Sequence, residues 1–140
     1  MGISIQVVKD TATESLRKYA AEDASRKREL VAAVAVDLQS YTVQSFTDRS
    51  KRESPWPNKV DGTEATLIGA PKLRPSIRVF SITDDSAVVG TDAIYAAVHQ
   101  DGSKKRNIRR RPYFPFTAKG ELFAPFSDRI DKLIQAAINF

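Results

Sequence analysis

The side chains best suited to acid–base chemistry lie in one short stretch near residue 100. His99 is the sole histidine of the 140-residue chain, and Asp92 and Asp101 flank it in sequence. An imidazole beside carboxylates can act as a general base, but no G-x-S-x-G, P-loop or G-x-G-x-x-G motif accompanies it. With no cysteine and no second histidine, the usual zinc ligand sets cannot form. We therefore predict no catalytic residue, no metal and no cofactor, and interpret His99 as structural.

A run of positive charge follows this stretch directly. The segment 102–111 is predicted to be a basic loop, and its cations are Lys104, Lys105, Arg106, Arg109, Arg110 and Arg111. Six positive charges set against Asp101 leave an excess equal to the net charge of +5 of the whole chain. Cations followed by aromatic residues can bind phosphates and stack bases, or they can dock on an acidic protein surface. A plain solvated loop is the third alternative, and the residues alone do not choose among the three.

The elements that must position these groups are a predicted hairpin and a short helix. Segments 77–82 and 87–90 have β-type patterns, and the polar residues 83–86 between them supply turn chemistry. The chain after the hairpin carries apolar residues at helical spacing up to Gly102, which predicts one or two helical turns. Thr91 or Asp92 is expected to cap that helix.

A long amphipathic helix is predicted for about residues 22–46. Its apolar row repeats every three and four residues: Leu30, Val31, Val34, Ala35, Leu38, Tyr41 and Thr42. Val36 and Val43 lie outside this row. They indicate either a second contact within the protein or a subunit interface, with nearly even weight.

The remaining segments complete the predicted architecture. A short edge strand is expected near residues 3–7, a helix near 10–20, and a final helix that begins at Ser127 or Asp128. A loop rich in charge and proline covers about 48–60, with Trp56 expected to cover the core. Pro75 is expected to mark the start of a strand.

Composition indicates one domain over residues 1–140. Hydrophobic residues make up 41% and charged residues 28%, which is typical of a water-soluble globular chain. No apolar run approaches the roughly 20 residues of a membrane helix, and the first residues lack the features of a secretory signal. The predicted class is α+β, with a small, mainly antiparallel sheet packed against the long helix and the C-terminal helix.

An ordered set of short motifs resembles the phage virion morphogenesis, or tail completion, proteins of Mu-like and P2-like phages. Segments like L-R-x-S-I, V-G-[ST], Y-A-x-x-H-Q-x-G and R-P-[FY] occur in the same order here. The matching residues include Leu73, Arg74, Ser76, Ile77, Val89, Gly90, Thr91, Tyr95, Ala96, His99, Gln100, Gly102, Arg111, Pro112 and Tyr113. Trp56 and Pro57 resemble the W-x-P loop of the family.

The resemblance implies a structural virion protein without enzymatic activity, which acts in tail completion or head–tail joining. It implies a homo-oligomeric ring, with a hexamer as the first expectation, in contact with other tail or neck proteins, possible contact with phage DNA, and no membrane. The protein would assemble in the host cytoplasm. Tyr95, His99 and Gln100 would hold the short helix against the hairpin, while Arg111 and Pro112 fix the return of the loop.

The resemblance makes two surfaces candidates for contact with neighbouring molecules: the basic loop, with Lys104, Lys105, Arg106, Arg109 and Arg110, and the hairpin tip, with Asp84 and Asp85. The Val36 and Val43 row, found independently from the helix pattern, is a third candidate. The alternative function is a nucleic-acid-binding module that uses residues 104–111.

Overall fold

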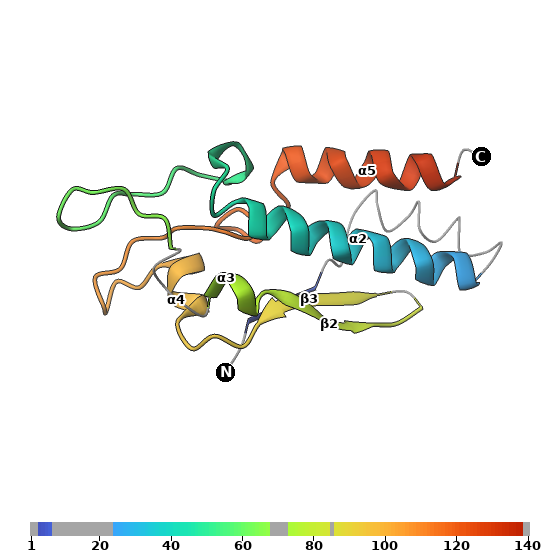
Figure 1. The fold of residues 1–140 in the computed structure, drawn as a ribbon, viewed down its shortest axis with the longest axis horizontal. Helices are drawn as coiled ribbons and strands as arrows, with labels where there is room; N and C mark the ends of the chain where they lie inside the picture. The colour runs from blue at the N-terminus through green and yellow to red at the C-terminus, as the bar shows by residue number, and fades with distance from the viewer. Residues whose placement is uncertain (1–2, 7–23, 68–72, 85, 139–140) are drawn as a thin grey trace.

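The computed structural model describes residues 3–6, 24–67, 73–84 and 86–138, with helices and a small sheet in layers (Figure 1). The elements in chain order are β1 (Ile3–Gln6), α2 (Ala24–Gln44), the 3-10 helix η1 (Arg49–Lys51), α3 (Leu73–Ser76), β2 (Arg78–Ile82), β3 (Ala87–Thr91), α4 (Ala96–Asp101) and α5 (Ala124–Ile138). This arrangement confirms the predicted α+β class. The helix predicted near residues 10–20 lies outside the described residues.

The described sheet has three antiparallel strands in the order β1-β3-β2. The predicted hairpin is confirmed as β2 and β3, and the predicted edge strand pairs with β3 from the other side. Phe80 is an extra residue in β2, because Val79 pairs with Val89 while Ser81 pairs with Val88. The bulge bends the outer strand and disrupts its edge, a feature that discourages pairing with foreign strands.

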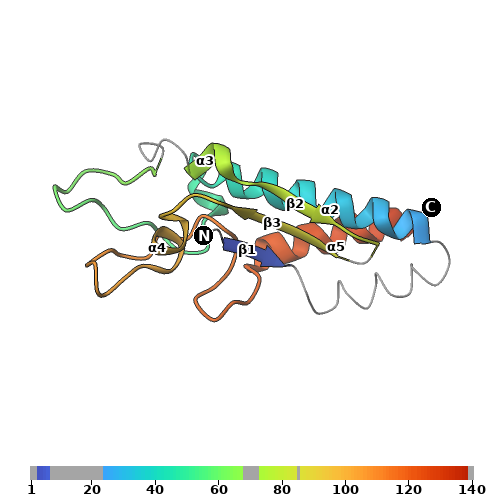
Figure 2. The same cartoon turned by 90° about the horizontal axis from the view of Figure 1, so that it is seen from below.

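The long helix α2 packs on one face of this sheet, and α5 packs on α2 (Figure 1). Seen from below, the strands lie in front of both helices (Figure 2). Every residue of the predicted apolar row of α2 is buried, so the periodicity located the core face correctly. α5 contributes Phe126, Ile130 and Ile134 to the same core, at a spacing of one helical turn.

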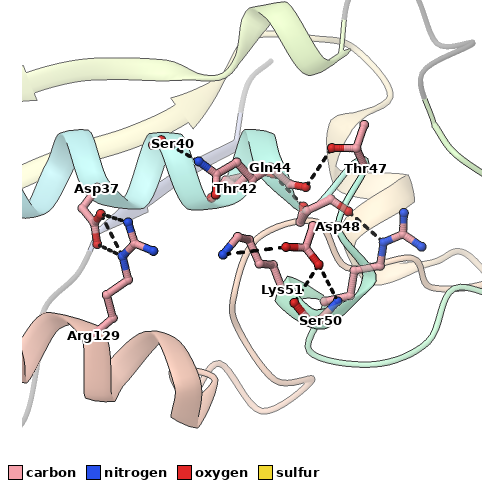
Figure 3. Close-up of polar contacts among 11 residues, drawn as sticks. Asp37, Ser40, Thr42, Gln44, Thr47, Asp48, Ser50, Lys51 and Arg129 are labelled. Carbon is pink, nitrogen blue, oxygen red and sulfur yellow. Dashed lines mark hydrogen bonds and ion pairs between the residues drawn. The ribbon is translucent and has the colours of Figure 1, made fainter.

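Figure 3 shows polar contacts along α2 and just beyond its end, among which the Asp37–Arg129 pair joins α2 to α5. Arg129 of α5 donates to both carboxylate oxygens of Asp37 in α2, at 2.7–3.0 Å. Beyond the end of α2, the Asp48 carboxylate accepts from the backbone N–H of Ser50 at 3.0 Å and thereby caps η1. The Arg129 side chain of this ion pair is 44% exposed, so solvent screens the pair. We attribute to it about 1 kcal/mol and regard burial as the main source of stability.

Three expected element boundaries are wrong. Pro75 lies in the four-residue helix α3 rather than at a strand start, because proline is well tolerated in a first helical turn. α5 begins at Ala124, before the expected caps Ser127 and Asp128, and the Phe123 carbonyl accepts from Ser127 N–H at 3.0 Å. Thr91 accepts from Ala93 N–H at 3.0 Å, which lies ahead of α4 rather than in its first turn.

Thr42 carries a buried hydroxyl in the described core, with no exposed area and no hydrogen-bond partner. Valine has the same branched shape without the polar atom. We expect Thr42→Val to raise the free energy of unfolding by about 1 kcal/mol, because an unpaired buried hydroxyl is costly. Urea denaturation measures the change, with Thr42→Ser as the variant that keeps the hydroxyl. A clear loss of stability in Thr42→Val would show that the hydroxyl has a partner.

Candidate functional site

Gln100 joins α4 to the segment 111–114 that returns from the basic loop. The side chain is 6% exposed, and its Oε1 accepts hydrogen bonds from the backbone N–H groups of Tyr113 and Phe114, at 3.0 and 2.9 Å. Nε2 donates to the Phe114 carbonyl at 3.4 Å. One amide therefore provides the pairing that a neighbouring strand would otherwise provide.

Two further bonds tie the same segment to α4. The Tyr113 hydroxyl donates to the Ala96 carbonyl at 2.7 Å, and Arg111 N–H donates to the His99 carbonyl at 2.8 Å. Tyr113 has no exposed area, and this burial raises the pKa of its hydroxyl above the ordinary value. We call α4 together with residues 111–114 the α4 clamp. Its contacts run to the returning segment rather than to the hairpin, which corrects the expectation for Gln100.

Trp56 attaches the proline-rich loop to the α4 clamp. Its ring is 8% exposed and lies edge-on to Phe46, with centroids 5.9 Å apart. The indole N–H donates to the Pro112 carbonyl at 2.9 Å, and the Arg52 guanidinium lies 3.6 Å from the ring centroid. The expectation that Trp56 covers the core is confirmed.

Arg110 and Arg111 point into the protein rather than into solvent. Arg111 donates to the backbone carbonyls of Pro57 and Asn58, at 2.8 and 2.9 Å. Arg110 pairs with Glu53 at 2.7 Å and donates to the Phe116 carbonyl at 2.9 Å. Arg111 thus fixes the return of the loop, as the resemblance implies. Arg110 serves the same purpose, although its sequence context suggested a contact with a partner.

Between these anchors the basic loop forms a tight hairpin. Ser103 and Ile108 exchange two backbone hydrogen bonds of 2.8 Å, and Asn107 N–H donates to the Lys104 carbonyl at 3.2 Å. Gly102 ends α4 at φ 75° and ψ 175°, and a Cβ at this position would lie 2.8 Å from the backbone nitrogen of Arg110. The loop base therefore has room only for glycine.

The other predicted contact residues differ in exposure. Val36 is 57% exposed, whereas Val43 packs against the core. Asp84 is exposed and pairs with Arg28 at 3.3 Å, and its neighbour Asp85 lies outside the described residues. Tyr95 is 60% exposed at the start of α4, so its ring does not hold the helix in place as expected.

His99 lies half-buried in the α4 clamp, and within the described structure its enclosed Nδ1 has no hydrogen-bond partner. Burial lowers the pKa of the imidazole below its ordinary 6.5, and the Arg111 guanidinium lowers it further. The imidazole is therefore neutral near pH 7. Among the described residues, no group of three or more histidine, aspartate or glutamate side chains could hold a metal ion.

The lowered pKa of His99 predicts a pH dependence of stability. Below about pH 6.5 the unfolded chain binds a proton that the folded protein rejects, so stability falls as the pH decreases and the loss levels off below the folded pKa. His99→Gln should reduce the loss of stability between about pH 7.5 and pH 5, measured by urea denaturation. The carboxylates titrate in both proteins and cancel in the comparison. Equal losses in both proteins would contradict this account.

A cavity of about 310 Å³ lies beside Trp56, and its lining includes the charged residues Arg49, Arg52, Glu53 and Glu64. Each of these charges has a partner: Arg49 pairs with Glu64, Glu53 pairs with Arg110, and Arg52 donates to the Ser45 carbonyl at 2.8 Å. This cavity offers neither a histidine nor a free nucleophile. The exposed cations of the basic loop therefore remain stronger candidates for a binding role than this cavity.

Comparison with known protein families identifies the family of this chain. The model of the phage virion morphogenesis family matches residues 3–123. The chain belongs to this family. Searches of curated proteins and of solved structures find no match. Membership in the phage virion morphogenesis family gives the protein a structural role in building a phage virion, with which it is therefore associated.

The family match covers the α4 clamp, the Trp56 loop and the basic loop, and it ends directly before α5. The resemblance of the short motifs to this family is confirmed. Residue patterns alone did not indicate the structural role of Gln100 in the α4 clamp, because the backbone groups that it binds lie 13 and 14 positions away in the sequence. None of the described helices is long and apolar enough to cross a membrane.

Proposed function

We propose that this phage virion morphogenesis protein is the subunit of a homo-oligomeric ring that completes the tail or joins it to the head. Family membership supports the proposal, together with apolar side chains exposed on two different parts of the surface. Val36 on α2 is 57% exposed, and Ile94 in the turn before α4 is 79% exposed. A head-to-tail ring needs two such surfaces on each subunit, because each copy presents a different face to each neighbour.

The α4 clamp supports the same role. Bonds from Gln100, Trp56 and Arg111 join α4, the proline-rich loop and the returning segment. A surface held in this way loses little further entropy on association, which favours a defined assembly over a flexible one. Tail or neck proteins that the ring meets would bind such preorganised loops.

Light scattering coupled to size exclusion tests the proposal directly. We expect a closed oligomer, with a hexamer as the first expectation, and we expect Val36→Asp and Ile94→Asp each to dissociate it. Val36→Thr is the matched control, since it keeps the branched shape without a charge. Mixing the two Asp variants should restore dimers if the Val36 surface meets the Ile94 surface, because one intact interface then remains.

A chain that stays monomeric at every concentration, and does not join isolated tails, would overturn the proposal. Complementation of a phage lacking the gene gives the biological readout. Val36→Asp should reduce infectivity while the protein stays folded, because the side chain is mostly exposed and its replacement removes little core packing.

A further inference from the structure

The basic loop displays four cations that the rest of the described protein does not neutralise. The side chains of Lys104, Lys105, Arg106 and Arg109 are exposed. Within the described part of the chain they form no ion pair, in contrast to Arg110 immediately beside them. Like charges so close together repel one another, and this repulsion is not relieved inside the protein.

The loop holds these charges on an anchored support rather than on a free tether. The Ser103 and Ile108 backbones are paired, and Arg106 N–H donates to Ser103 Oγ at 3.2 Å. The base is fixed by the Arg110 and Arg111 bonds and by the close approach at Gly102. Because the loop is anchored, its cations cannot move apart to reduce their mutual repulsion. A bound polyanion would reduce this repulsion by neutralising the charges.

We infer that this loop binds the phosphate backbone of duplex DNA, without sequence selection. Protein interfaces centre on apolar and aromatic anchors and are depleted in lysine, whereas the four-residue turn at positions 104–107 offers no apolar side chain. Phosphate contacts need only cations. The inference is independent of the ring and holds for any oligomeric state.

Single-stranded nucleic acid fits the site less well. Stacking of bases requires exposed aromatic rings, but Tyr113 and Phe114 after the loop have no exposed area. The exposed ring of Tyr95 lies at the opposite end of α4 from the loop. Buried rings cannot stack bases, so the alternative in which the aromatic residues after the loop stack bases loses Tyr113 and Phe114. The exposed cations remain as the binding groups.

Fluorescence anisotropy with a short labelled DNA duplex tests the inference on the full chain. Four phosphate contacts predict that the logarithm of the binding constant falls against the logarithm of salt concentration with a slope of about −3 to −4. The triple variant Lys104→Gln, Lys105→Gln and Arg106→Gln should reduce the steepness of that slope by about 3 and weaken binding at low salt by about tenfold or more.

The matched control removes the same charge elsewhere. A second triple variant replaces three lysines outside the loop: Lys27→Gln, Lys119→Gln and Lys132→Gln. We expect its DNA binding to keep the salt dependence of the original protein. Equal losses in the two triple variants would overturn the inference, as would the absence of duplex binding at low salt. Tighter binding of single strands or of polyglutamate would also overturn it, in favour of base stacking or an acidic protein surface. Light scattering on the same samples reports the oligomer separately.

Discussion

Replacing Gln100 with methionine is expected to lower the free energy of unfolding by about 2–4 kcal/mol. Methionine has nearly the same length and fills the space, but it cannot accept the N–H bonds of Tyr113 and Phe114. Both donors lie in a segment without exposed area, so water cannot take the place of the amide. Two unpaired donors account for the expected size, and urea denaturation measures it.

Gln39 offers a matched control for the same substitution. Its Nε2 donates a single bond, to the Ile77 carbonyl at 3.1 Å, at a half-buried position on α2. Gln39→Met should therefore cost no more than about 1 kcal/mol. Similar losses at the two positions would refute the role assigned to Gln100. Gln100→Glu, which keeps an accepting oxygen, should recover part of the stability lost in Gln100→Met.

Regular features of the fold follow from local patterns, and these were predictable. The burial of α2 follows from spacing at three and four residues, because this period maps onto one face of a helix. The hairpin follows from two β-type runs around a polar turn. Gly102 was predicted as a helix stop, and its positive φ confirms it. Each of these features depends on residues that are neighbours in the sequence.

The features that sequence reasoning missed depend on partners far along the chain. Arg110 looks like the cations around it until Glu53, 57 positions away, is brought to 2.7 Å. Gln100 likewise looks like an ordinary polar residue of a short helix, because its role depends on the later segment that contains Tyr113 and Phe114. The resemblance to the family pointed to Gln100 and Arg111 without giving their bonds. The bulge at Phe80 depends on the register of two strands, which their composition does not fix.

Gly102→Ala is expected to destabilise the protein by about 2–6 kcal/mol. The φ of 75° and ψ of 175° at this position belong to a region essentially confined to glycine, at a cost of about 1–3 kcal/mol for other residues. The added Cβ would also lie 2.8 Å from the nitrogen and 3.2 Å from the Cα of Arg110. These are backbone atoms held by the Arg110 side-chain bonds, so relieving the overlap costs about a further 1–3 kcal/mol.

Gly120→Ala separates the two contributions. Gly120 also has a positive φ, of 82°, but a Cβ there would meet no atom within 4 Å. We expect this variant to lose only the backbone cost of about 1–2 kcal/mol, and urea denaturation compares the two. Equal losses would show that the loop base can yield to a methyl group and is not rigid. A folded Gly102→Ala protein should instead carry a displaced loop, and its DNA binding should weaken while all four loop cations remain.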